Sequence, residues 1–153
     1  MTADHTAGED FRLLTPEAFD FVLSNELKRA VRSQNFLTLV VFDPHLEPSG
    51  VQGVREVARI VSREVRETDL LTASPDGRLS LVLLDADLQS SRRVIARVMS
   101  RLEHYQFTTP VDVEVGAASC PTQGSDPGTL RRAAAADAAA SRGSQRGTGS
   151  NAQ

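Results

Sequence analysis

The spacing of the hydrophobic residues predicts four amphipathic helices. In four stretches of the chain the apolar side chains recur every three or four positions, as they do on one buried face of a helix. These stretches are, approximately, 15–31, 54–65, 88–102 and 126–141. The first has the clearest beginning, because Thr15 can cap a helix and Pro16 suits its first turn.

Runs of β-prone residues between the helices predict strands. Residues 36–42 are nearly all apolar, which is typical of a strand buried on both faces. The turn sequence Ser-Pro-Asp-Gly at 74–77 lies between runs that begin at Leu70 and Leu79, so a β-hairpin is predicted there. Residues 111–117 alternate apolar and polar side chains, as in a half-exposed strand. Strands that alternate with helices indicate an α/β fold, with helices packed on the faces of one sheet.

Length and composition fit a single domain in a reducing compartment. A chain of 153 residues can bury one core without disulfides or a structural metal, and its one cysteine, Cys120, suits a cytoplasmic protein. No apolar run is long enough to span a bilayer, and the N-terminus has no signal-peptide pattern. We expect a loose tail at 1–10, a folded domain at 11–142 and a disordered, Gly- and Ser-rich tail at 143–153.

Charge and motifs argue against several functions. The net charge of −3 does not attract nucleic acid, and the arginine-rich stretch 92–101 contains no aromatic residue on which a base could stack. The three histidines, His5, His45 and His104, are too scattered to indicate a metal site. No glycine-rich phosphate-binding loop is present. We therefore predict no metal, no cofactor, no membrane association and no nucleic-acid partner.

Several short motifs, taken in order, resemble the GGDEF domains of diguanylate cyclases, enzymes that condense two GTP molecules into cyclic di-GMP. The matching positions are Leu14-Thr15-Pro16 at the family's "LTG" helix start, Leu37 to Asp43 at its first strand, Asp69-Leu70-Leu71 before its signature hairpin, Val113 to Ala118 at its "SIGVA" strand, and Ala136-Asp137 with Gly147 at its closing "AD…G" helix. The order and spacing of these matches extend over nearly the whole chain. The resemblance implies an α/β (α+β) fold of the GGDEF or nucleotidyl-cyclase type, with a central mixed five-stranded sheet flanked by helices.

The residues that would carry cyclase chemistry are missing. Pro75-Asp76-Gly77-Arg78-Leu79 stands where the family has Gly-Gly-Asp-Glu-Phe, whose acids hold Mg²⁺ and whose glycines let the backbone approach GTP. Asp43 remains at the end of the first strand, but His45 replaces the family's second metal-binding aspartate. Ser144 falls where a phosphate-contacting lysine of the family is expected. We therefore predict that the domain is not an enzyme, and that Pro-Asp-Gly serves here as a tight turn.

A ligand-binding motif of the family is retained. Active members often carry an inhibitory Arg-x-x-Asp site just before the strand that leads to the signature turn, and Arg66 and Asp69 match it at the family's spacing. Arg97 falls at the position of a supporting arginine on the following helix. The resemblance implies that these three residues bind cyclic di-GMP. The chemistry agrees, because an arginine fork suits guanine O6 and N7 or a phosphate, and an aspartate suits the N–H donors of guanine.

The sequence therefore predicts a catalytically inactive cyclic di-GMP receptor that signals by ligand-dependent oligomerisation or partner contact. In the family a bound pair of ligand molecules commonly bridges two protein molecules, so a homodimer or ligand-bridged oligomer and a protein effector are expected. Two alternatives stay open. The first is a ligand-independent interaction or dimerisation module, in which Arg66 and Asp69 merely pair at a helix end and Arg97 lies on a solvated face. The second is GTP binding through Asp43 without turnover.

Overall fold

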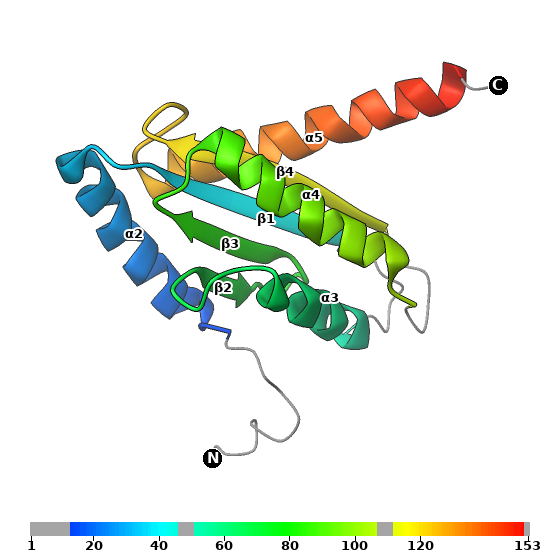
Figure 1. Ribbon diagram of the computed structural model, residues 1–153, viewed down its shortest axis with the longest axis horizontal. Helices are drawn as coiled ribbons and strands as arrows, with labels where there is room; N and C mark the ends of the chain where they lie inside the picture. The colour runs from blue at the N-terminus through cyan, green and yellow to red at the C-terminus, as the bar shows by residue number, and fades with distance from the viewer. Residues whose placement is uncertain (1–12, 46–50, 107–111, 152–153) are drawn as a thin grey trace, which may run out of the picture.

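Within the described residues, four strands form one sheet that carries helices on both faces (Figure 1). The structure is a computed structural model, and it describes residues 13–45, 51–106 and 112–151. In chain order its elements are α2 (Pro16–Ser33), β1 (Leu37–His45), α3 (Val51–Arg63), β2 (Leu70–Ala73), β3 (Leu79–Leu84), α4 (Leu88–His104), β4 (Asp112–Cys120) and α5 (Pro127–Asn151). The predicted helices and hairpin are therefore confirmed, whereas the predicted tail at 1–10 lies outside the described residues. No helix in the described part of the chain combines the length and apolar character needed to cross a membrane.

The sheet has the strand order β2-β3-β1-β4, and each neighbouring pair is antiparallel. The α/β (α+β) fold class is confirmed, but the described residues form four strands rather than the expected five, and the sheet is not mixed. Among these residues a parallel contact occurs only at the isolated bridge between Leu14 and Thr72. Residues 121–126, between β4 and α5, form turns and bends rather than a further strand.

Successive residues of β1 contact helices on opposite faces of the sheet, because side chains alternate along a strand. Leu39 lies in one core cluster with Phe19 of α2 and Leu130 of α5. Val40 lies in the other cluster, with apolar residues of α3 and α4. Helices α2 and α5 therefore cover one face, and α3 and α4 cover the other. This layering places the surfaces of α3 and α4 next to each other.

Two elements extend beyond the bounds that the hydrophobic pattern predicts. Strand β1 continues through Pro44 to His45 by pairing with β4 alone, because β3 begins opposite Phe42 and does not reach the last residues of β1. A proline is tolerated at such an edge, where no partner strand needs its N–H. Helix α5 continues past Ser141 to Asn151, through the segment predicted as a disordered tail. Once a helix has been nucleated, each further residue adds one hydrogen bond, and here this propagation continues through residues that include Gly143, Gly147 and Gly149.

Candidate functional site

The predicted Arg-x-x-Asp motif forms a tight turn between α3 and β2. The Asp69 side chain is only 2% exposed. Its Oδ2 accepts the backbone N–H of Arg66 at 3.0 Å, and its Oδ1 accepts the backbone N–H of Leu84 at 3.2 Å. The backbone N–H of Asp69 in turn donates to the carbonyl of Arg66 at 3.0 Å. The carboxylate thus closes the turn on itself and joins it to the end of β3.

Arg66 projects from this turn with most of its side chain in solvent. The side chain is 62% exposed, and its Nη2 lies 3.6 Å from Asp69 Oδ1. The same nitrogen donates a hydrogen bond to the carbonyl of Leu84. These contacts fix one edge of the guanidinium group. In the part of the chain that the structure describes, the N–H donors of the other edge have no partner, as a ligand-binding arginine requires.

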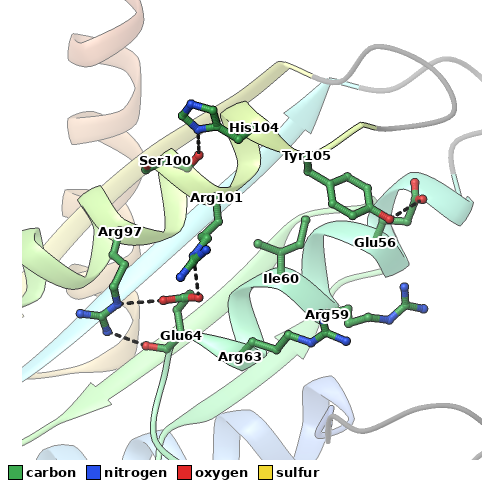
Figure 2. A pocket seen from close by; sticks show the side chains of 10 residues that line it. All are labelled: Glu56, Arg59, Ile60, Arg63, Glu64, Arg97, Ser100, Arg101, His104 and Tyr105. Carbon is green, nitrogen blue, oxygen red and sulfur yellow. Dashed lines mark hydrogen bonds and ion pairs between the residues drawn. The ribbon is translucent and has the colours of Figure 1, made fainter.

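Arg97 lies on α4, where Glu64 holds it against the end of α3 (Figure 2). Its Nε donates to Glu64 Oε1 at 2.8 Å, and its Nη2 donates to the carbonyl of Glu64 at 2.8 Å. Arg101, one helical turn further along α4, contacts the other oxygen of the same carboxylate, with Nε 3.2 Å from Oε2. The Glu64 side chain is 13% exposed, whereas those of Arg97 and Arg101 are 51% and 67% exposed. One largely buried carboxylate therefore fixes two exposed guanidinium groups side by side.

A groove of about 770 Å³ separates α3 from α4, and Arg97 is part of its lining (Figure 2). Neither Arg66 nor Asp69 lines it. The structure therefore brings Arg97 close to the turn, through its bond to the carbonyl of Glu64, but leaves the turn just outside the groove. Of the three predicted site residues, Arg66 and Arg97 present free donors at the surface, and Asp69 is buried in structural contacts.

The hairpin turn between β2 and β3 places a cation against Asp43, the aspartate at the end of β1. Arg78 Nε lies 3.5 Å from Asp43 Oδ2 and 3.9 Å from Asp76 Oδ2. Gly77 adopts φ +93°, a left-handed conformation that glycine tolerates well, and its N–H donates to the carbonyl of Ser74 at 2.9 Å. The described residues contain no group of three or more His, Cys, Asp or Glu side chains that could hold a metal ion. His5 and the side chains of His45 and Ser144 lie outside what the structure describes.

Sequence reasoning did not identify Glu64 and Arg101 as neighbours of the predicted site. The signal that was present is the four-residue spacing of Arg97 and Arg101, which puts both side chains on one side of their helix. The bond between Glu64 and Arg97 joins residues 33 positions apart. Helical periodicity gives no information about a contact over that separation.

Comparisons based on sequence give no match, either with a family model or with a curated protein. Comparisons of structure, in contrast, find solved GGDEF domains that resemble this chain. A sensory box/GGDEF family protein from Caulobacter crescentus superimposes with a TM-score of 0.76 at 17% identity, over 90% of this chain and 99% of that one. The GGDEF domain of DgcB from the same organism, solved in complex with c-di-GMP, gives 0.75 at 18% identity, over 90% and 91%.

A third neighbour comes from a larger protein. The diguanylate cyclase SiaD from Pseudomonas aeruginosa, solved in complex with its activator SiaC, gives a TM-score of 0.75 at 22% identity, over 86% of this chain and 56% of that one. Likeness at such low identity establishes the fold and not the activity. The chain has the fold of a GGDEF domain.

Proposed function

We propose that this chain is a catalytically inactive GGDEF-like domain that serves as a receptor for cyclic di-GMP. In this proposal Arg66 and Arg97 contact the ligand, and Asp69 holds Arg66 in place. The observation that carries the proposal is the contrast between two sites. Two exposed arginines with free donors lie at the retained Arg-x-x-Asp site, whereas Arg78 pairs with Asp43 at the site where the fold family holds its metal.

The ion pair at the hairpin supports the absence of cyclase activity. Phosphoryl transfer in this fold family depends on Mg²⁺, and Mg²⁺ is bound by carboxylates and by substrate phosphates. Here the retained carboxylate of Asp43 faces the guanidinium of Arg78, and a cation in that position repels a divalent metal. The residues present therefore do not fit the metal, and no catalytic step is assigned to them.

The chemistry of the ligand suits the two exposed arginines. Guanine presents the acceptors O6 and N7 on one edge, and a planar guanidinium can meet both at once. A planar guanidinium can also donate two hydrogen bonds to the oxygens of a phosphodiester. The burial of Asp69 and its two backbone hydrogen bonds favour a positioning role for this residue over direct contact with guanine.

The output of such a receptor would be a second protein or a second copy of this chain. The diguanylate cyclase SiaD, which contains this fold, was solved in complex with an activator protein, SiaC, and this precedent supports a protein partner. We propose that ligand occupancy at Arg66 and Arg97 changes contacts of this kind.

Calorimetric titration of the purified chain with cyclic di-GMP tests the receptor function. We expect saturable binding in the parent, loss of binding in Arg66→Ala, and unchanged binding in Arg92→Ala, which removes an exposed arginine of α4 outside the site. Absence of binding in the parent would reject the receptor function and favour a ligand-independent interaction module. Incubation with GTP and Mg²⁺ should yield no cyclic di-GMP. Thermal stabilisation by GTP that requires Mg²⁺ would instead support residual GTP binding through Asp43.

A further inference from the structure

The groove between α3 and α4 is a positively charged region on an acidic chain. Arg59 and Arg63 stand one helical turn apart on its α3 wall, and Arg97 and Arg101 stand one turn apart on its α4 wall (Figure 2). Against these four arginines the lining contains two acids, Glu56 and Glu64. With His104 neutral, the groove therefore carries two net positive charges, whereas the whole chain carries −3.

Several of these guanidinium groups keep donors available for a ligand. Within the described residues, the side chains of Arg59 and Arg63 form no hydrogen bond or ion pair, and only the backbone carbonyl of Arg59 accepts one, from the Ser62 hydroxyl. Arg101 uses only its Nε, in the contact with Glu64, and its side chain is 67% exposed. Because Glu64 also holds Arg97, the outward N–H groups of the two α4 arginines are fixed next to each other. A fixed pair of guanidinium groups loses little rotamer freedom when an anion binds.

We propose that cyclic di-GMP bound at Arg66 and Arg97 extends into the α3–α4 groove, where Arg101 and Arg63 contact its phosphates. This inference rests on the proposed receptor function and adds two binding residues that the Arg-x-x-Asp motif does not contain. The ligand has two phosphodiester groups with one negative charge each, which matches the two net positive charges of the groove. The groove volume of about 770 Å³ lies within the usual range for pockets that bind small organic ligands.

The test is a series of calorimetric titrations with cyclic di-GMP at fixed salt. We expect Arg101→Ala and Arg63→Ala each to weaken binding about tenfold or more, because each removes a charge-assisted contact to a phosphate. Arg101→Lys should give an intermediate affinity, since it keeps the charge but loses the fork. Both positions are exposed, so the variants should fold, which circular dichroism verifies. Arg92→Ala is the matched control on the same helix and should bind as the parent does.

The pattern across the series separates this inference from the receptor function. If Arg66→Ala loses binding while Arg101→Ala and Arg63→Ala bind as the parent does, the ligand is confined to the turn and the groove inference is overturned. If the groove variants lose binding while Arg66→Ala keeps it, the groove is the site and the motif assignment is wrong. A parent that does not bind overturns the receptor function and this extension together.

Discussion

At the scale of single residues, the carboxylate of Asp69 accepts hydrogen bonds from two backbone N–H groups, one on each oxygen. An amide has only one oxygen and so cannot replace both contacts. Its two oxygens accept the backbone N–H groups of Arg66 and Leu84. In Asp69→Asn one oxygen becomes an NH₂ donor, so one buried N–H loses its acceptor and faces another donor. We expect the free energy of unfolding to fall by about 1–3 kcal/mol, measured by urea denaturation. The cyclic di-GMP affinity should fall too, because Arg66 loses its ion pair with Asp69 and keeps only the carbonyl of Leu84 as a side-chain partner.

The matched control for this variant is Asp112→Asn, which makes the same chemical change at an exposed residue of β4. Surface substitutions of this kind usually change stability by less than about 0.5 kcal/mol. Equal urea midpoints for the two variants would contradict the structural role of Asp69. A stable Asp69→Asn variant that has lost ligand binding would instead restore the direct contact with guanine that the sequence predicts.

At the scale of elements, the packing of α5 on β4 depends on the absence of a side chain at Gly116. A Cβ atom there would lie 2.1 Å from the carbonyl oxygen of Ala134 and 2.5 Å from the backbone nitrogen of Ala138. Neither backbone atom can move without shifting the helix. We therefore expect Gly116→Ala to lower the free energy of unfolding by about 1–3 kcal/mol or more, measured by urea denaturation.

The same substitution in α5 provides the control. At Gly128, in the first turn of the helix, the nearest atom to an added Cβ is a flexible nitrogen of Arg132 at 3.4 Å. Alanine is the better helix former, so Gly128→Ala should be neutral or slightly stabilising. If Gly116→Ala is as stable as Gly128→Ala, helix α5 does not approach β4 as closely as the structure has it.

Two helices begin at aspartates whose carboxylates cap them, and this makes stability depend on pH. The backbone N–H of Ser90 holds the pKa of Asp87 below its ordinary value of 3.8, and the backbone N–H of Thr129 does the same for Asp126. A pKa that is lower in the folded state stabilises the fold above the ordinary value. This stabilisation is lost as the pH falls through the lower, folded value.

The double variant Asp87→Asn/Asp126→Asn tests this effect, because asparagine still caps helices but does not titrate. We expect the variant to remain folded at neutral pH and to lose less stability than the parent between about pH 5 and pH 2. Thermal midpoints at several pH values measure both curves. Parallel curves for parent and variant would show that the two caps contribute nothing to acid unfolding.

The elements that the sequence predicts well are those whose signals are local. Thr15 and Pro16 mark the start of α2, and the cap is present, with the Thr15 hydroxyl accepting the N–H of Ala18 at 3.1 Å. The end of β1 depends instead on its pairing with β4 beyond the start of β3, which nothing near Pro44 reveals. The candidate site divides in the same way. Arg66 and Asp69 lie three positions apart in a short motif that the sequence shows directly. The contacts of Asp69 with Leu84 and of Glu64 with Arg97 join distant residues and form only in the folded chain.

At the scale of the whole molecule, the β2–β3 hairpin separates the two sites of the fold. The turn at its closed end contains Arg78, which pairs with Asp43 of β1, and the Arg66–Asp69 turn joins Leu84 at its open end. Strand β3, Leu79–Leu84, spans about 17 Å between them at roughly 3.4 Å per residue. The proposed loss of cyclase activity at one end is therefore compatible with an intact ligand site at the other end.

This separation also allows the proposed ligand site to face a second molecule. Arg66 and Arg97 expose 62% and 51% of their side chains, so a bound ligand would keep a large surface open to solvent. A pair of stacked dinucleotides in that position could be covered by the same site of another copy, which gives a symmetric, self-complementary contact. We expect sedimentation velocity to show a shift from monomer to dimer when cyclic di-GMP is added to the parent chain.

The shift should be absent in Arg66→Ala and present in Arg92→Ala, because only the first removes a ligand contact. It should also weaken at high salt, since the attraction between exposed arginines and phosphates is screened within about 10 Å at 0.1 M salt. A dimer that forms equally with and without ligand would mean that assembly is independent of the nucleotide. If the chain binds the ligand but stays monomeric, the receptor would act through a different protein. That protein would bind to the surface that the ligand and the α3–α4 groove form together.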